Sequence, residues 1–285
     1  MNVDKKKKML LSKFITNGMT NELRKLDSPL QKKYVNTFFC SSTITEYPDG
    51  SYSSKYCKNR WCLTCNRILT GRLINLYHNS IKALDDKWFI TLTIPNVYGF
   101  ALPEAYKLMS MTFRQCLDII RKRKFIFRGF RKLEVTYNKD QDDYHPHYHV
   151  LVNNKEIAFL LLNLWLEKLS FCSPAAQDIR QADEKSIKEL FKYFTKLTYN
   201  NKFMPVEALN EIFVSLYGYR VFFAYKLLRN KDVVKPDERL GGQSYWYYYD
   251  RRDWFNIDDK SFSGMSKTEI VTAVRDFCSR SAINF

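Results

Sequence analysis

The sequence lacks any apolar stretch long enough to cross a membrane. The longest one, at 159–165, is interrupted by Asn163 and falls far short of the roughly 20 residues that a spanning helix needs. No apolar segment or small-residue cleavage site follows the lysine run at 5–8, so we expect no secretory signal. Apart from that run, the chain has no low-complexity segment and no internal repeat. These absences favour a cytoplasmic protein over a secreted or membrane-spanning one.

Acidic residues are scarce relative to basic ones. The 285 residues include 46 Lys and Arg against 30 Asp and Glu, which gives a formal net charge of +16. Such an excess is typical of a protein that binds a polyanion. Hydrophobic residues make up 45% of the chain and charged residues 27%, a balance that excludes overall disorder and permits a hydrophobic core. We therefore expect a folded, basic protein with a polyanionic partner.

The cysteines do not suit a disulfide framework. There are seven, an odd number, and four of them lie close together as Cys40, Cys57, Cys62 and Cys65. Clustered cysteines in a chain without an export signal favour a metal site over disulfides. A CxxC turn presents two thiolates to one tetrahedral Zn²⁺, so we expect a structural four-cysteine zinc site. A redox interpretation would need a βαβ context, which this segment lacks.

Periodicity predicts an antiparallel α+β domain. Three segments alternate in the manner of strands, and we expect the last two to form a hairpin: 88–94, 132–137 and 147–152. Three others show the spacing of helices: 103–123, 155–169 and 184–198. Helical patterns continue from 205 to about 230, although the part at 217–228 fits a strand or a helix.

Three of the four histidines fall within five residues, as His145, His147 and His149. Side chains alternate along a strand, so all three imidazoles share one face. Imidazoles at i and i+2 can chelate one divalent cation and leave positions open for a phosphate oxygen. A hairpin centred near Asp142 would place Glu134 opposite His149 on that face. We expect a metal site made of His147, His149 and Glu134, with His145 as the alternative third ligand.

A second group of polar residues follows helical spacing. Glu189, Tyr193 and Lys196 are separated by four and three residues, which places them on one helical face. A tyrosine hydroxyl can attack a phosphodiester from which a metal withdraws charge. A carboxylate one turn away can later act as base for water, and a lysine can hold a phosphate. Taken alone the pattern is common on helices, so it identifies no site by itself.

Together these motifs resemble those of the HUH endonuclease superfamily, in particular the replication initiator (Rep) proteins of rolling-circle plasmids. The segments that resemble them are a cysteine-rich segment, a threonine-bearing strand, the histidine strand and the tyrosine helix: 57–65, 89–97, 145–151 and 192–196. Leu63 departs from the pattern, because a proline is usual there. The resemblance extends over about 40–230.

The resemblance implies a ferredoxin-like fold in which the histidines lie on a central strand of an antiparallel sheet. We expect four regions along the chain: a basic arm at 1–35, a zinc-binding segment at 36–70, an HUH endonuclease core at 71–200 and a mainly helical extension at 201–285.

The resemblance also implies a reaction. A Mg²⁺ or Mn²⁺ ion polarises the scissile phosphate, and Tyr193 attacks it to give a 5′-phosphotyrosine link and a free 3′-OH primer. Glu189 occupies the position of the glutamate that directs water at termination, and Lys196 lies where it could hold a phosphate. Tyr199 is an alternative second tyrosine. The implied partner is single-stranded or supercoiled origin DNA, and host helicase and DNA polymerase would follow the nick.

Ten basic residues are expected to contact DNA phosphates: Lys5, Lys6, Lys7, Lys8, Arg121, Lys122, Arg123, Lys124, Arg128 and Arg131. The aromatic run at 245–249 could stack on bases, but packed core or a subunit contact is the favoured interpretation. Two other functions remain as alternatives: a relaxase or transposase of the same superfamily, and a noncatalytic zinc-containing DNA-binding regulator. A relaxase usually carries its tyrosine before the histidines, and a regulator has no need of an intact set of metal ligands and tyrosine.

Overall fold

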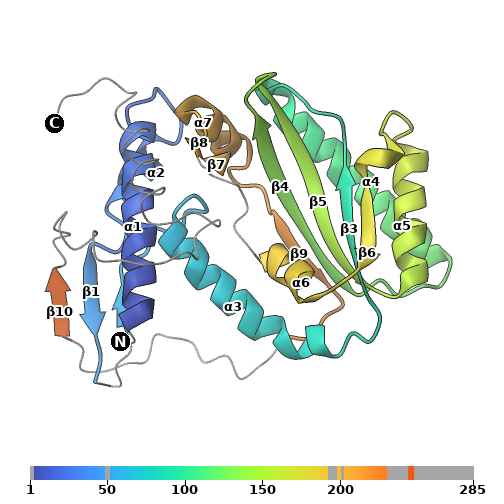
Figure 1. Cartoon of the computed structure of the whole chain (residues 1–285), viewed down its shortest axis with the longest axis horizontal. Coiled ribbons are helices and arrows are strands. Elements are labelled where there is room, and N and C mark those ends of the chain that lie inside the picture. Colours follow the sequence, from blue (N-terminus) through green and yellow to red (C-terminus); the bar gives the residue numbers. More distant parts are fainter. Residues whose placement is uncertain (1–2, 49–51, 192–197, 200–201, 230–242, 247–285) are drawn as a thin grey trace. The chain divides into compact units, whose positions relative to one another are not determined.

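The computed structural model describes residues 3–48, 52–191, 198–199, 202–229 and 243–246 (Figure 1). The chain divides into two compact units. The sheet unit takes in Thr70–Lys196 and Glu211–Val233, and the N-terminal unit takes in Met1–Leu69, Leu197–Asn210 and Val234–Phe285. None of the described helices combines the length and apolar character needed to span a membrane.

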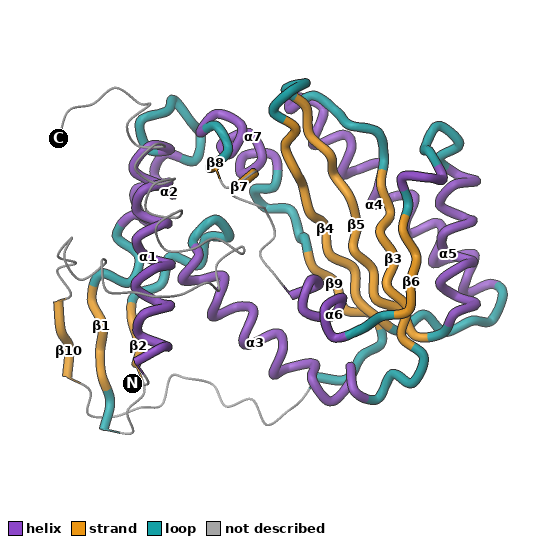
Figure 2. The backbone as a smooth tube through the Cα atoms, viewed as in Figure 1, coloured by secondary structure: helices purple, strands orange, loops and turns teal. Residues whose placement is uncertain are grey.

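A five-stranded antiparallel sheet forms the centre of the sheet unit, and its strands follow the order β6-β3-β5-β4-β9 (Figure 2). The strands are β3 (Lys87–Thr93), β4 (Gly129–Asn138), β5 (Asp143–Asn153), β6 (Asp178–Gln181) and β9 (Phe222–Tyr225). The three strands predicted from alternation are thus confirmed, and β4 and β5 form the expected hairpin. The undecided segment at 217–228 contributes the edge strand β9.

Two helices, α4 (Leu102–Lys122) and α5 (Lys155–Lys168), cover one face of this sheet. Phe113 of α4 and Trp165 of α5 both pack edge-on against Tyr148 of β5, with ring centroids 5.7 and 6.0 Å apart. The amphipathic spacing at 103–123 and the apolar run at 155–169 predicted both helices. Asn154 caps α5, since its side chain accepts hydrogen bonds from the backbone N–H groups of Glu156 and Ile157.

The opposite face packs against α6 (Glu184–Phe191) and the C-terminal part of α3 (Leu63–Lys82). Tyr77 of α3 and Leu190 of α6 join one hydrophobic cluster with Phe89, Phe130 and Leu151 of the sheet. Side chains one residue apart on a strand point to opposite faces, so the neighbours of Tyr148 in β5 lie on this second face. The apolar cluster therefore fixes α6 beside the histidines.

The N-terminal unit contains two helices where a basic arm was expected. Residues 3–35 include α1 (Val3–Leu23) and the start of α2 (Gln31–Phe38). Ile15, Met19 and Leu23 of α1 are spaced by four and are at most 1% exposed. That spacing gives α1 an apolar face, which the nearby lysine run obscures in the sequence.

The other elements are short. In the N-terminal unit, β1 (Thr43–Glu46) pairs with β2 (Tyr52–Ser54) and β10 (Gln243–Trp246), and β7 (Thr198–Tyr199) pairs with β8 (Lys202–Phe203). Helix α7 (Val206–Ser215) has residues in both units, and η1 (Gly99–Ala101) and η2 (Pro174–Ala176) are single 3₁₀ turns of the sheet unit. The C-terminal region at 201–285, expected to be mainly helical, is described only in part: α7 is a helix, whereas β9 and β10 are strands that extend two sheets.

Candidate functional site

Strands β4 and β5 place the predicted metal ligands on one face of their hairpin. Glu134 lies opposite His147, and Lys132 lies opposite His149. The expected pairing of Glu134 with His149 is wrong by two residues, because the turn at 139–142 is centred earlier than assumed. Since side chains alternate with a period of two, this shift leaves Glu134 on the histidine face.

The side chains of Glu134, His147 and His149 converge. Each offers one ligand atom within 4.8 Å of the others, and His149 Nε2 lies 3.5 Å from Glu134 Oε2. The Nδ1 atom of His147 lies 3.1 Å from the His145 carbonyl oxygen, and Nδ1 of His149 lies 3.4 Å from Thr91 Oγ1. Partners at Nδ1 orient both rings and direct Nε2 towards a metal. Two imidazoles and a carboxylate suit a divalent cation.

The alternative third ligand, His145, is not part of this group. Its ring centroid lies 5.2 Å from that of His147, but the residues that could share an ion are Glu134, His147 and His149. The geometry therefore favours Glu134 over His145 as the third ligand.

Buried charge prepares these ligands for a cation. Burial alone would raise the pKa of Glu134, but the ammonium of Lys132 and the two histidines outweigh it and hold that pKa below its usual range. Burial lowers the pKa of His147 to about 4, which Glu134 opposes only in part. At neutral pH the carboxylate is therefore ionised and His147 is neutral, and these are the forms that bind metal.

Lys132 connects this site to α6. Its side chain is fully buried (0% exposed), and Nζ donates to Glu134 Oε2 at 2.8 Å and to the backbone carbonyl of Glu189 at 3.2 Å. Lys132 was not predicted as part of this site, although its position two residues before Glu134 places both on one face of a strand. Of the tyrosine-helix residues, Glu189 lies in α6, half-buried, whereas Tyr193 and Lys196 fall outside the described residues.

The threonine-bearing strand β3 lies directly beside the histidine strand. Thr91 pairs with His149, and Thr93 pairs with His147. Gln177 fixes the end of β3, because its amide accepts from the backbone N–H of Thr93 at 2.7 Å and donates to Thr93 Oγ1 at 3.0 Å. The threonine-bearing strand and the histidine strand, two of the segments that resemble Rep proteins, are thus neighbours in one sheet.

The four clustered cysteines form a second candidate metal centre, in the N-terminal unit. Sγ of Cys40 lies 3.6 Å from Sγ of both Cys62 and Cys65, and Cys57 Sγ lies 3.6 Å from Cys65 Sγ. Sulfurs bound tetrahedrally to one Zn²⁺ at 2.3 Å would be about 3.8 Å apart, so the cluster fits that ion. All four are free thiols with no disulfide among them.

Backbone and lysine groups surround this cysteine cluster. The N–H groups of Cys57 and Lys58 donate to the sulfurs of Cys40 and Cys65, each at 3.3 Å. Lys13 of α1 is 1% exposed, and its Nζ donates to the carbonyl oxygens of Phe38, at 2.7 Å, and Cys40. Donors of this kind would offset the negative charge of four thiolates.

The predicted DNA contacts of the sheet unit divide into two groups. Five are exposed, at the end of α4 and in the segment that follows it: Arg121, Lys122, Arg123, Lys124 and Arg128. Arg131 is only 4% exposed, and its guanidinium lies 4.4–4.8 Å from the ring centres of Phe113, Tyr148 and Phe223. The structure therefore contradicts its assignment as a phosphate contact, since cation–π packing encloses its charge.

The remaining expectations fall partly on residues that the structure describes only as backbone or not at all. Lys5, Lys6, Lys7 and Lys8 lie in α1. In the aromatic run, the residues up to Trp246 belong to β10, which pairs with β1, and 247–249 lie outside the described residues.

Comparison with known proteins agrees with the geometry. A family model described as "Replication protein" matches residues 51–167, a span that includes the CxxC segment and the whole histidine hairpin. A "Protein rep" of Staphylococcus aureus is 34% identical over 166 residues, which cover 51% of this chain and 71% of that protein. No solved structure matches the chain.

Two other relatives are matched over shorter spans. "Protein rep" of Bacillus sp is 32% identical over 108 residues, and that of Bacillus amyloliquefaciens is 32% identical over 115 residues. The chain spans about a third of the length of these two proteins, 34% and 33% respectively. Because the match to the Staphylococcus aureus protein covers most of that protein, the chain belongs to the replication (Rep) protein family, as its resemblance to rolling-circle plasmid initiators implies.

Proposed function

We propose that this chain initiates rolling-circle plasmid replication by nicking one strand of origin DNA. The observation that carries the proposal is the convergence of Glu134, His147 and His149 on one face, with α6 held beside them through Lys132. The βαββαβ order from β3 to β6, with strand order β6-β3-β5-β4, supports a ferredoxin-like HUH core within 71–200.

In the proposed reaction the chain binds origin DNA and orients the scissile phosphate over the histidine face. A bound Mg²⁺ or Mn²⁺ would supply positive charge that polarises this phosphate. The Tyr193 hydroxyl oxygen forms a bond to phosphorus and gives up its proton, while the bond from phosphorus to the 3′ oxygen breaks. That oxygen takes a proton and becomes the free 3′-OH primer. The 5′ phosphate stays attached to the tyrosine.

Two further residues have roles in this proposal. Glu189 would accept a proton from water at termination, when the phosphotyrosine link is broken and the strand is released or closed. Its backbone contact with Lys132 places the residue's helix next to the metal ligands. Lys196 would hold a phosphate oxygen.

Zinc at the four cysteines would stabilise the N-terminal unit and take no part in the reaction. Host helicase and DNA polymerase would act on the nicked product.

The test is covalent capture of DNA. Supercoiled DNA that carries this gene and its flanks would be incubated with Mn²⁺ and either wild type or Tyr193→Phe, then run on a denaturing gel. We expect a protein–DNA adduct with wild type alone, while both proteins bind the DNA equally. Tyr199→Phe is the matched control and should still form the adduct.

Other outcomes point to the alternative functions. An adduct that persists in Tyr193→Phe and disappears in Tyr199→Phe would move the nucleophile to Tyr199. Tight binding with no adduct from any of the three proteins would contradict nicking and favour a noncatalytic regulator. Sequencing the nicked strand distinguishes a replication origin from the transfer origin of a relaxase.

A further inference from the structure

Helix α2 has one side that is buried and one that is exposed. Tyr34 and Thr37 are fully buried (0% exposed). Five of its exposed residues recur at the spacing of one helical face, with exposed Lys33 beside them: Gln31, Lys32, Val35, Asn36 and, at the C-cap, Phe39. At 3.6 residues per turn these five positions fall within an arc of about 140°. The face therefore combines amide, cationic and apolar groups in a single strip.

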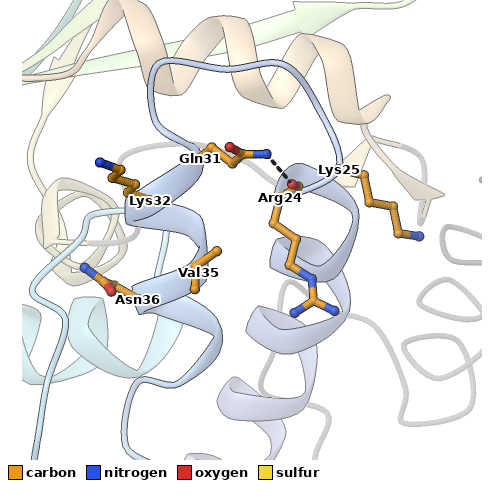
Figure 3. A pocket seen from close by; sticks show the side chains of 6 residues that line it. All are labelled: Arg24, Lys25, Gln31, Lys32, Val35 and Asn36. Atoms are coloured by element: carbon orange, nitrogen blue, oxygen red, sulfur yellow. Dashed lines mark hydrogen bonds between the residues drawn. The ribbon is translucent and has the colours of Figure 1, made fainter.

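Four residues of this strip line a hollow between α2 and the segment that follows α1; in Figure 3 Gln31 points towards Arg24, whereas Lys32 and Asn36 point away from it. The hollow, of about 490 Å³, is lined by residues of α2 and by Arg24 and Lys25, which follow α1. Gln31 Nε2 donates to the Arg24 carbonyl oxygen at 3.2 Å. The Arg24 guanidinium packs 4.6 Å from the ring centre of Phe38. The hollow is thus an ordered, cationic concavity beside the exposed strip.

The buried side of α2 is fixed to the cysteine-rich segment. Thr37 Oγ1 accepts hydrogen bonds from Asn59 Nδ2 at 2.8 Å and from Trp61 Nε1 at 2.9 Å. The ring of Tyr34 packs edge-on against that of Trp61, 5.2 Å away, and its hydroxyl donates to Asn210 Oδ1 at 2.8 Å. Lys13 binds carbonyl groups at the C-terminal end of α2 and just beyond it. Such anchoring would hold the exposed strip rigid while it contacts a ligand.

The charge of this region indicates what the ligand is. Residues 1–69 contain thirteen Lys and Arg but five Asp and Glu, so about half of the net charge of +16 comes from a quarter of the chain. A strongly basic surface attracts nucleic acid. The strip also holds the groups that distinguish bases in the major groove: asparagine and glutamine pair with adenine, lysine with guanine, and apolar side chains touch the thymine methyl.

We propose that α2 enters the major groove of double-stranded origin DNA and contacts base edges through Gln31, Lys32 and Asn36. This inference rests on the proposed function, because it takes origin DNA as the ligand. A helix with its side chains is about 10–12 Å in diameter, and the major groove is about 12 Å wide, so α2 fits into the groove. Arg24 and Lys33 flank the strip and would contact phosphates, which position the helix without reading sequence.

The test compares a base-reading residue with a control cation. Fluorescence anisotropy would measure binding of an origin duplex and of a scrambled duplex by wild type, Asn36→Ala and Lys55→Ala. Asn36→Ala should weaken origin binding about 5- to 150-fold and leave binding to the scrambled duplex unchanged. Lys55→Ala removes an exposed charge of the same unit outside α2, and it should leave the ratio of the two affinities at the wild-type value. Asn36 is exposed, so thermal unfolding and zinc content should not change.

The proposal would be overturned if Asn36→Ala kept the wild-type ratio of the affinities for the origin and scrambled duplexes. It would also be overturned if wild type bound the two duplexes equally well. A loss confined to single-stranded DNA would also overturn it, because a single strand has no major groove. Cleavage of a single-stranded oligonucleotide that contains the nick site keeps the two proposals apart. Asn36→Ala should cleave it at the wild-type rate. Failure of wild type to cleave it contradicts the nickase function but not recognition of the duplex by α2.

Discussion

Removing the ammonium of Lys132 should destabilise the sheet unit more than any ordinary surface change. Lys132 and Glu134 are 0% and 1% exposed, and their charged atoms lie 2.8 Å apart. Loss of one partner from a buried ion pair costs about 3–5 kcal/mol, because the other charge stays buried without compensation. We therefore expect a loss of about 3 kcal/mol in Lys132→Met at pH 7.

The loss should depend on pH in a defined direction. In wild type the pKa of Glu134 is depressed, so its contribution to stability is present above the unfolded pKa of about 4.3 and disappears as the pH falls through the lower folded value. Without Lys132, burial of Glu134 is less compensated, so its pKa rises relative to wild type, and the cost of the buried carboxylate fades as the pH falls and the group takes up a proton. The difference between wild type and Lys132→Met should thus shrink from pH 7 towards pH 4.

Hydrogen exchange followed by mass spectrometry is the appropriate assay, because peptides that cover β4 and β5 report the opening free energy of this sheet. Lys139→Met, an exposed change in the turn of the same hairpin, is the matched control and should alter little. The double variant Lys132→Met/Glu134→Gln removes both charges and should recover most of the loss. A loss below about 1 kcal/mol in Lys132→Met, or a double variant as unstable as the single one, would refute the argument from buried charge.

Three further predictions concern the remaining polar groups. Cys62→Ser should lower bound zinc from one ion per chain to nearly none and destabilise the N-terminal unit; unchanged zinc by elemental analysis would count against the four-cysteine site. The pKa of His147 is about 4 in the folded protein, below its unfolded value. Between pH 6.5 and pH 4, wild type should therefore lose up to about 3 kcal/mol more stability than His147→Gln, as measured by urea unfolding. Parallel stability profiles of the two proteins would contradict this prediction. Arg131→Met should destabilise the fold but leave the salt dependence of nonspecific DNA binding unchanged, whereas Arg123→Ala should reduce its slope by about one; a reduced slope in Arg131→Met would restore Arg131 as a phosphate contact.

Periodicity predicted much of the sheet unit, because its strands and helices bury whole faces. Alternation located β3, β4 and β5, and helical spacing located α4 and α5 to within a few residues. The hairpin register depends instead on where the turn is centred, which the apolar pattern does not specify. The candidate metal site was predicted in spite of the register error, since a shift of two residues keeps Glu134 on the same face.

Other features escaped prediction for physical reasons. Lys132 and Arg131 were hard to place because basic residues on strands are usually solvated, yet here an ion pair and three aromatic rings make their burial favourable. Helix α1 was missed although Ile15, Met19 and Leu23 have helical spacing, because its lysine run suggested an arm. Strand β6 has only four residues, too few to show the alternation of apolar and polar residues by which a strand is predicted.

Strand β9 has a consequence for how far the chain can be shortened. It pairs with β4 over four residues, from Gly129 opposite Tyr225 to Lys132 opposite Phe222, and the N–H of Leu133 donates to the Val221 carbonyl oxygen at 2.7 Å. Without β9, the outer edge of β4 would present unpaired backbone groups to other molecules, and such edges promote strand-to-strand aggregation. A fragment that keeps the outer edge of β4 paired must therefore extend at least to residue 225, past the last residue proposed to take part in the reaction.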